Sequence, residues 1–362
     1  MNKLKGKQKL KILTIQNLVT KLPGFTLGPI NLDIDEYEYY VLFGPNGSGK
    51  STLLKTILGF YRPESGKIIV NNVDITKIPI EKRNIGYVPQ SYSLFNNMSV
   101  KENLEFGLRV RKINKKDREE KINEVSEMLN IKNLLNKKSN QLSSGQQQLV
   151  SIARSLVTSP KLLLLDEPLS NLDPQVKQNI RKVLKKIKNS RKTTIIHVTH
   201  LIEDAYELSS NIIFLYKGRI LEMGNSMDLF LYPKTKELAE YLGYINIFPA
   251  EIKKTNNDLV VSLDSNFNLK IRNDYYESEN VFVAFRPQDV IIQDNILTDY
   301  INNNCFKGVI EDFTITSNGF LYTIKVSDKI NIVFLSDKKF ENGKKISFCI
   351  DPNKIRIVKE LK

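Results

Sequence analysis

A glycine-rich run near the start of the chain has the residue types and spacing of a phosphate-binding loop. Residues 44–51 read GPNGSGKS and fit the pattern G-x-x-x-x-G-K-[ST]. Glycines let successive backbone N–H groups face phosphate oxygens, Lys50 can reach the β- and γ-phosphates, and the Ser51 hydroxyl can bind Mg²⁺. A helix that begins here directs the positive end of its dipole at the same anion. The residues expected to contact the phosphates are Gly44, Pro45, Asn46, Gly47, Ser48, Gly49, Lys50, Ser51 and Thr52.

Two adjacent carboxylates follow an apolar run further along the chain. Residues 162–165 are four leucines, which is typical of a buried strand, and Asp166 and Glu167 come directly after them. Strands often end in acidic turns, so this pattern gains its meaning from being paired with Lys50. Beside the phosphate loop, Asp166 can hold Mg²⁺ through water and Glu167 can polarise an attacking water molecule.

Strands and helices are expected to alternate around these residues. Continuous apolar runs predict buried strands, and apolar residues at three- and four-residue spacing predict helices. The helix after Ser51 is expected to stop at Gly59, because glycine commonly ends helices. The alternation implies a parallel sheet with right-handed crossovers. The expected strands are residues 39–43, 67–70, 162–165 and 194–198, and the expected helices are 100–135, 143–157 and 175–188.

The chain changes character near Gly243. The segments after it alternate apolar and polar residues with period two and are separated by Asn, Asp and Gly, which is typical of strands. They predict a small all-β domain. The segments are residues 259–263, 321–326, 330–335, 346–350 and 355–358.

The order of these motifs resembles that of the nucleotide-binding subunit of an ABC transporter. Residues 142–148 read LSSGQQQ and match the LSGGQ segment of that family, just before a helix. In relatives this segment binds the γ-phosphate of ATP held by the opposite subunit, through a serine hydroxyl, backbone N–H groups and a helix N-terminus. The resemblance assigns this role to Ser143, Ser144, Gly145 and Gln146. Ser144 stands where the family usually has glycine, which bears on how closely the backbone approaches the nucleotide.

The same resemblance assigns further site residues. Gln90 matches the Q-loop glutamine, which contacts Mg²⁺ or the attacking water and senses the membrane partner. Asp173 lies in a segment similar to the D-loop, which crosses the dimer interface. His200 matches the switch histidine at the γ-phosphate, whereas His197 is expected to face the core. Phe25 stands where transport relatives place an aromatic ring under the adenine, and an ordinary core phenylalanine is the alternative.

The resemblance implies an α/β P-loop NTPase, with a RecA-like core and a helical subdomain, followed by a small all-β OB-like barrel domain. The ATPase domain is expected over residues 1–242, its helical subdomain over about 91–158, and the barrel domain over 243–362. The run FRPQDV at 285–290 resembles an element of the C-terminal domain of importer ATPases. Within it, Arg286 is alternatively only a structural ion-pair partner.

The resemblance also implies a partner set and a substrate. The runs at 81–90 and 23–27 look most similar to molybdate/tungstate importers, with sugar, polyamine and ferric iron importers as alternatives. Two copies are expected to dimerise around two ATP molecules with Mg²⁺ and to drive separate transmembrane permease subunits. An extracellular substrate-binding protein would act indirectly. The expected location is the cytoplasmic face of the cell membrane, as a peripheral protein.

The charge distribution keeps a second class of function open. The net charge is +14, yet from Ile245 to the end basic and acidic residues are equal at 16 each. Basic runs at 3–11, 109–121 and 177–192 suit an anionic membrane surface or nucleic acid, or a merely solvated face.

The competing reading is a soluble ABC ATPase that acts on nucleic acid or ribosomes. Such relatives usually carry two fused ATPase halves, coiled coils or CxxC motifs, which this sequence lacks, so nucleic acid is not the expected partner. A small-molecule P-loop kinase is disfavoured by residues 142–146 and by His200.

The remaining composition narrows the chemistry. The only histidines are His197 and His200, so any histidine chemistry converges on one short segment. Cys305 and Cys349 lack metal-ligand spacing and are expected to be reduced thiols in the core. No apolar run reaches the roughly 18–20 residues that a membrane-spanning helix needs, and a soluble, intracellular protein is expected.

Overall fold

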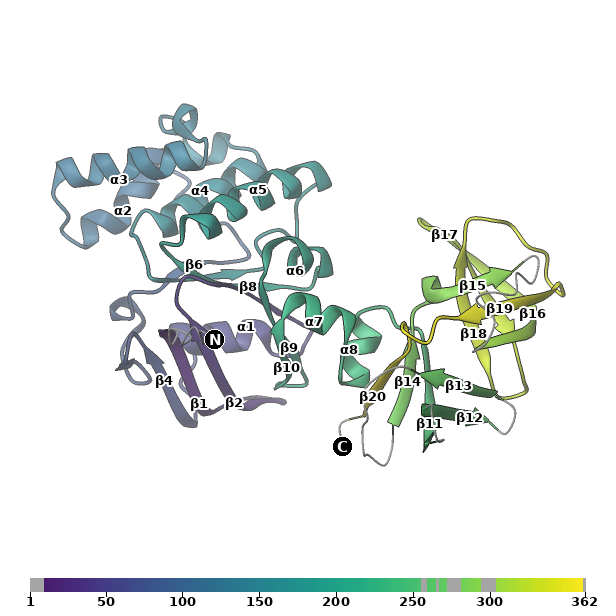
Figure 1. Cartoon of the computed structure of the whole chain (residues 1–362). Helices are drawn as coiled ribbons and strands as arrows, with labels where there is room; N and C mark the ends of the chain where they lie inside the picture. Colours follow the sequence, from purple (N-terminus) through teal and green to yellow (C-terminus); the bar gives the residue numbers. More distant parts are fainter. Residues whose placement is uncertain (1–9, 255–258, 265–266, 272–280, 294–303, 361–362) are drawn as a thin grey trace, which may run out of the picture. The chain divides into compact units, whose positions relative to one another are not determined.

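The computed structural model describes residues 10–254, 259–264, 267–271, 281–293 and 304–360 (Figure 1). The chain packs as two compact units, Met1–Met227 and Asp228–Lys362. This division lies ahead of the 242/243 boundary that the sequence predicts, because helix α8 packs against strands β14 and β20 of the second unit.

A six-stranded sheet forms the centre of the first unit. The strand order is β10-β9-β3-β8-β7-β6, and every neighbouring pair is parallel except β9 with β10. Strands β3, β7 and β8 are buried along their whole length, which explains their continuous apolar sequences. The expected parallel α/β sheet is confirmed. The strands are β3 (Tyr39–Phe43), β6 (Gly86–Val88), β7 (Leu162–Asp166), β8 (Thr194–Thr199), β9 (Asn211–Tyr216) and β10 (Arg219–Asn225).

A smaller antiparallel sheet, of order β2-β1-β4-β5, shares a core with the central sheet. Leu18 of β1, Leu54 of helix α1 and Leu164 of β7 belong to one buried apolar cluster, so α1 packs between the two sheets. Helix α1 ends at Gly59, which takes the left-handed conformation expected of a glycine stop. The elements are β1 (Lys11–Leu22), β2 (Phe25–Asp35), β4 (Ser65–Val70), β5 (Val73–Asp74) and α1 (Lys50–Leu58).

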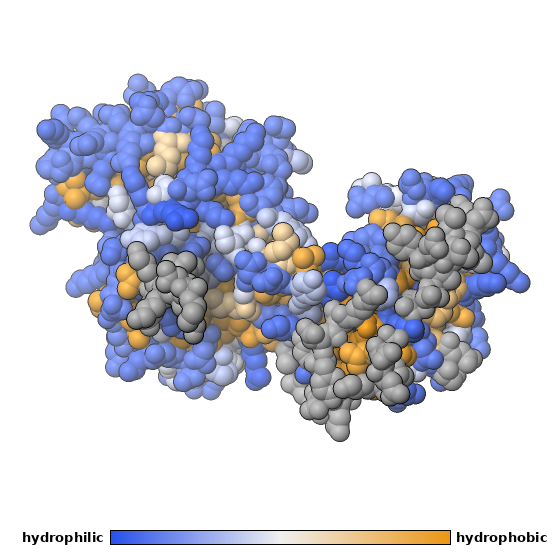
Figure 2. All heavy atoms as spheres, viewed as in Figure 1, coloured by the Kyte–Doolittle hydropathy of each residue, from blue (hydrophilic) through white to orange (hydrophobic). Residues whose placement is uncertain are grey.

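Helices connect the later strands of the central sheet (Figure 1). Helices α2 to α4 lie between β6 and β7, α5 lies between β7 and β8, and α6 lies between β8 and β9. The helical pattern over 100–135 is two α-helices rather than one, because Lys112 is in the left-handed region and Asn114 caps a new helix through Asp117. The surface over helices α2 to α5 is mainly hydrophilic on the face drawn in Figure 2. The helices are α2 (Val100–Val110), α3 (Lys115–Met128), α4 (Ser144–Leu156), α5 (Pro174–Ser190) and α6 (Ile202–Leu208).

The second unit confirms the expected all-β domain. Its strands form two five-stranded antiparallel sheets, of order β13-β12-β11-β14-β20 and β15-β19-β16-β17-β18. Phe285 from the first sheet and Tyr322 from the second lie in one buried cluster. The elements are α7 (Ser226–Leu231), α8 (Lys236–Tyr241), β11 (Asn246–Lys254), β12 (Leu259–Asp264), β13 (Phe267–Ile271), β14 (Val281–Phe285), β15 (Val290–Gln293), β16 (Cys305–Thr316), β17 (Gly319–Lys325), β18 (Asn331–Ser336), β19 (Lys345–Ile350) and β20 (Arg356–Lys359).

Arg286 has a structural role in this unit. Its guanidinium lies 4.5 Å from the ring centre of Tyr244, and Nη2 donates to the Phe230 carbonyl at 2.8 Å. Arg356 donates to the next carbonyl, that of Leu231. The two arginines therefore donate hydrogen bonds to the last carbonyl oxygens of α7. Carbonyl oxygens at the end of a helix have no hydrogen-bond partner within the helix.

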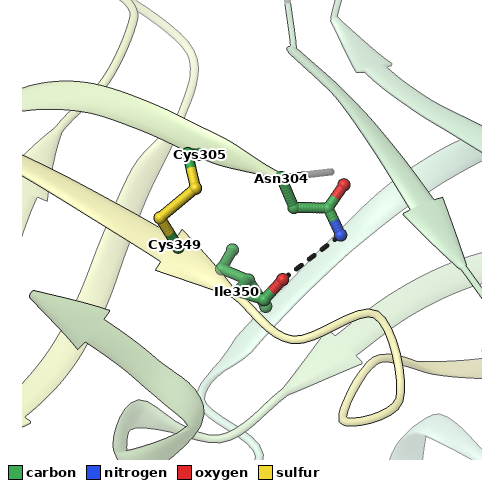
Figure 3. Close-up of a disulfide and its surroundings, with 4 residues drawn as sticks. All are labelled: Asn304, Cys305, Cys349 and Ile350. Carbon is green, nitrogen blue, oxygen red and sulfur yellow. Dashed lines mark hydrogen bonds between the residues drawn. A yellow bond between two sulfur atoms is a disulfide. The ribbon is translucent and has the colours of Figure 1, made fainter. Parts of the chain in front are cut away.

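The expectation of two reduced core cysteines is wrong. Cys305 of β16 and Cys349 of β19 are joined by a disulfide, and Cys305 is exposed (Figure 3). The two residues are direct cross-strand partners, which places their side chains on the same side of the sheet. Beside them, Asn304 donates from Nδ2 to the Ile350 carbonyl (Figure 3).

None of the helices in the described part of the chain combines the length and apolar character required to cross a membrane.

Candidate functional site

The phosphate-binding loop connects strand β3 to helix α1. Its glycines have positive φ angles of 150° at Gly44, 76° at Gly47 and 104° at Gly49. A Cβ atom at Gly44 would lie 2.0 Å from the Leu215 carbonyl oxygen, so no larger residue fits there. A Cβ at Gly47 would meet nothing within 4 Å. The loop therefore packs closely against strand β9 at Gly44 and has open space at Gly47. Such a loop can turn its backbone N–H groups towards a phosphate.

Lys50, the first residue of α1, is held across this loop. Its Nζ donates to the carbonyls of Gly44 at 2.8 Å and Pro45 at 2.9 Å. Burial lowers the pKa of Lys50, while the nearby carboxylates of Glu167 and Asp166 act in the opposite direction. The ammonium is thus positioned beside the loop where phosphates would sit.

Ser51 and Asp166 meet at the end of strand β7. The Ser51 hydroxyl donates to Oδ1 of Asp166 at 2.8 Å. Burial raises the pKa of Asp166, and it raises the pKa of Tyr87, whose hydroxyl lies 3.4 Å from Oδ2 of Asp166, to about 12. The sequence does not predict the contact of Tyr87 with Asp166. In this segment the resemblance to the Q-loop singles out Gln90 alone.

Glu167 lies between the two other residues predicted to be catalytic. Its Oε2 is 3.3 Å from His200 Nδ1 and 3.5 Å from Gln90 Nε2. The backbone supports this position, because Glu167 has a φ of 48° and its N–H donates to the Val198 carbonyl on β8. Glu167, His200 and Gln90 therefore gather from three different strand ends.

Residues 143–146 begin helix α4. The Ser143 hydroxyl accepts from the Gln146 N–H and the Gln146 side chain accepts from the Ser143 N–H, which is a capping box. Ser143 and Ser144 are exposed, whereas Gly145 is buried. A Cβ at Gly145 would lie 2.4 Å from Cγ1 of Val176 on α5. Glycine is therefore required here by packing within the chain, and Ser144 takes an ordinary helical position.

Phe25 and Asp173 lie at the edges of the site. Phe25 begins β2, packs partly buried against the core, and its ring would be 2.7 Å from a Cβ at Gly49 of the loop. Both alternatives for Phe25 agree with this position. Asp173 is the exposed residue before α5, and its side chain makes no capping hydrogen bond. His197 is fully buried, as expected, and its Nδ1 is 2.9 Å from the Tyr39 hydroxyl.

The residues present fit a nucleotide phosphate and Mg²⁺. Ser48 Oγ, in the loop, is buried and has no hydrogen-bond partner among the described residues. Ser51, Asp166 and Gln90 offer the oxygen ligands that Mg²⁺ prefers. Among the described residues no cluster of three His, Cys, Asp or Glu side chains is arranged for a metal.

Comparison with known proteins agrees with this geometry. The family model described as ABC transporter matches residues 27–170. The molybdate/tungstate import ATP-binding protein WtpC of Pyrococcus horikoshii is 38% identical over 301 residues, which cover 83% of this chain and 85% of that protein. The chain belongs to the ABC transporter family. The spermidine/putrescine import ATP-binding protein PotA of Clostridioides difficile is 33% identical over 92% of this chain and 93% of its own length.

Solved ABC structures share the fold of this ABC protein. The cbiO1 structure from Clostridium perfringens, part of the transporter complex cbiONQ, superposes with a TM-score of 0.57 at 32% identity and covers 64% of this chain and 94% of that one. A dimeric post-hydrolysis structure of the ATP-binding cassette MJ0796, bound to ADP and Pi, gives 0.53 at 30% identity, over 59% of this chain and 98% of that one. The present chain is accordingly an ABC ATPase.

Proposed function

We propose that this protein is the ATP-hydrolysing subunit of an importer. The observation that carries the proposal is the meeting of Glu167 with His200 and Gln90 beside the contact of Ser51 with Asp166. This arrangement provides a base for water next to a phosphate loop. The names of the relatives in Pyrococcus and Clostridioides, both import ATP-binding proteins, supply the direction of transport.

Each site residue has a defined role in this proposal. Lys50 neutralises charge on the β- and γ-phosphates, and the backbone N–H groups of Gly44 and of residues 46–52 orient them. Glu167 accepts a proton from the attacking water. His200 and Gln90 hold the Glu167 carboxylate and the terminal phosphate in position. Bound Mg²⁺, held by Ser51, Asp166 and Gln90, would polarise the phosphates. Phe25 is proposed to lie under the adenine.

The complete site is proposed to need a second copy of the chain. Ser143 and Ser144 are exposed at the start of α4, where N–H groups and the helix dipole favour an anion. Their contact with a γ-phosphate would come from the opposite subunit, together with Gly145 and Gln146. Asp173, exposed at the start of α5, would lie at the same interface. A dimeric ABC cassette among the solved structures supports this arrangement.

A cleft next to Gln90 is proposed to receive a helix of the permease. Its volume is about 380 Å³. Phe95, just beyond it, is 39% exposed, and its ring centre lies 4.7 Å from that of Phe106. Arg154 stacks over Phe95 and donates to the Ser93 carbonyl. The residues lining the cleft are Gln90, Ser91, Tyr92, Ser93, Leu94, Asn96, Gln147 and Asn171.

The nucleic-acid alternative is weakened by how the basic run on α5 is used. Arg181 binds Asp204 and Glu207, Lys185 binds Glu207, and Lys188 donates to the Leu208 carbonyl. These three of the eight cations in this run therefore make contacts within the fold, whereas Lys182 and Lys186 are exposed. The proposed location is peripheral, at the cytoplasmic face of the membrane.

The proposal is tested by a pull-down from native membranes with the Glu167→Gln variant loaded with ATP and Mg²⁺. Mass spectrometry should identify a multispanning permease, together with its extracellular binding protein. The Lys50→Ala variant is the matched control, because it should not be held in the ATP-bound state. Recovery of ribosomal proteins or nucleic acid, without a membrane subunit, would replace the transport function by the alternative.

The proposed substrate is an oxyanion, molybdate or tungstate, by analogy with the WtpC relative, and a polyamine is the alternative. Uptake of labelled molybdate, tungstate and spermidine would be compared in cells with and without the chain. Loss of oxyanion uptake alone supports the proposal. Loss of spermidine uptake alone would assign the polyamine instead.

A further inference from the structure

A buried ion pair joins Arg181 to Asp204, which lies four residues after His200 in the chain. Asp204, in the first turn of α6, is fully buried, and Arg181 of α5 is 7% exposed. Arg181 Nη2 lies 2.6 Å and Nε 2.8 Å from Oδ1 of Asp204. Buried charges of this kind are costly to keep unless each is paired, so the pair fixes the position of α6 against α5.

The second oxygen of Asp204 reaches the histidine segment through Thr199. The Thr199 hydroxyl donates to Oδ2 of Asp204 at 2.8 Å and accepts the N–H of Leu201 at 3.0 Å. Thr199 and Leu201 are the two neighbours of His200 in the chain. One hydroxyl therefore ties the backbone on both sides of His200 to a buried carboxylate.

The other groups near Asp204 leave this arrangement intact. His197 Nε2 is 4.0 Å from Oδ2 of Asp204 and lies in a fully buried side chain, where burial lowers the histidine pKa to about 4. Glu207 accepts from the third guanidinium nitrogen of Arg181, Nη1, and is also bound by Lys185. Arg181 is accordingly the charged partner that balances Asp204.

We propose that Thr199 and Asp204, anchored by Arg181, are positioning residues that hold His200 at Glu167. This inference rests on the role proposed above for His200. His200 Nδ1 lies 3.3 Å from Glu167 Oε2, and a shift of about 1 Å in a supporting segment can reduce turnover by as much as 100-fold. The inference assigns a function in hydrolysis to side chains that do not touch the nucleotide.

The first test compares two substitutions at Thr199 in the full-length protein. Thr199→Val keeps the shape of the side chain and removes the hydroxyl, whereas Thr199→Ser keeps the hydroxyl. We expect Thr199→Val to lower kcat by about tenfold or more with the KM for ATP unchanged, and Thr199→Ser to restore kcat. Thr193→Val is the matched control, because that buried hydroxyl donates to the Pro160 carbonyl, away from His200. Unchanged kcat in Thr199→Val overturns the inference.

The second test separates positioning from stability. Arg181→Met and Asp204→Leu each leave a buried charge unpaired, so both single variants should unfold at lower temperature. The double variant removes both charges and should regain thermal stability. We expect its kcat to stay about tenfold below that of the wild type. A double variant with both stability and kcat restored would give the pair a structural role only.

His200→Ala distinguishes failure of this inference from failure of the proposed function. If His200→Ala hydrolyses ATP at the wild-type rate, the role of His200 itself is lost. If His200→Ala is inactive while Thr199→Val is fully active, the role of His200 stands and the positioning role of Thr199 is wrong.

Discussion

The Nδ1 atom of His200 lies 3.3 Å from Oε2 of Glu167, within reach of a hydrogen bond. Glu167 follows β7 and His200 follows β8, two parallel neighbours of the central sheet. Parallel strands end at the same edge, which brings residues distant in the sequence together. In this protein the edge therefore joins the proposed base to the residue proposed to contact the terminal phosphate.

Replacement of Glu167 by Gln should reduce ATP hydrolysis by about 100-fold or more, because the amide cannot accept the proton of the attacking water. ATP binding should persist, and the variant should accumulate as an ATP-bound dimer. Steady-state phosphate release and size-exclusion chromatography with ATP measure the two effects. Glu203→Gln, an exposed carboxylate in the first turn of α6, should behave like the wild type. Near-normal hydrolysis in Glu167→Gln would remove this residue from the role of base.

Replacement of Lys50 by Ala should weaken ATP binding by roughly 10- to 100-fold, the usual range for losing a hydrogen bond from a charged group. Isothermal titration calorimetry with ATP and Mg²⁺ gives the affinity directly. Lys101→Ala, on the exposed side of α2, serves as control. Equal affinities for both variants would argue against phosphate binding by Lys50.

Replacement of Gly145 by Ala should destabilise the protein by about 1–3 kcal/mol, because the new methyl group would overlap Val176 Cγ1. Urea unfolding measures the loss. Adding Val176→Ala removes the overlapping atom and should restore most of the free energy of unfolding. If the double variant were no more stable than Gly145→Ala, this contact would not be the cause.

The buried His197 should make stability depend on pH. Its pKa is lowered to about 4 from an ordinary value near 6.5, so the folded state holds the neutral ring while the unfolded chain takes up a proton. The stabilisation is complete above about pH 6.5 and is lost as pH falls towards 4, by about 3 kcal/mol in total. Urea unfolding of the wild type and of His197→Gln across this range tests the effect. The variant should lose that part of the slope, and equal slopes would contradict the prediction.

The disulfide should stabilise the second unit. Cys305 and Cys349 are 44 residues apart, and closing a loop of that length corresponds to about 4 kcal/mol in the chain-entropy model. Reduction should release two thiols to maleimide labelling and lower the unfolding temperature. The variant with both cysteines replaced by serine should unfold at the lower temperature, and adding reductant should not change that temperature. Two labelled thiols in the unreduced native protein would contradict the pairing.

Local patterns predicted the buried strands β3 and β7 and the glycine-rich loop before α1, but not the break between α2 and α3. The glycines of residues 44–49 indicate backbone freedom, and the continuous leucines of 162–165 indicate a buried strand. The contacts of Tyr87 with Asp166 and of Arg181 with Asp204 depend on which strands and helices become neighbours. A single sequence carries no local signal for such pairs.

The cysteine pair illustrates the same limit. Period-two alternation predicts a strand over 346–350, which is part of β19, but none over β16. The order β15-β19-β16-β17-β18 is also not the order of the chain. Cys305 faces Cys349 only because β19 inserts between β15 and β16. The expectation of two reduced thiols rested on the number and spacing of the cysteines, which carry no information about strand order.

Lys50 illustrates how the fold prepares the loop for its ligand. A free lysine side chain samples many rotamers, and restricting them costs up to about 2 kcal/mol. Because Nζ is already bound to the carbonyls of Gly44 and Pro45, that freedom is lost on folding rather than on binding. A triphosphate bound as proposed would offer its oxygens to an ammonium group whose direction is already fixed. The loop would in this sense be preorganised for phosphate.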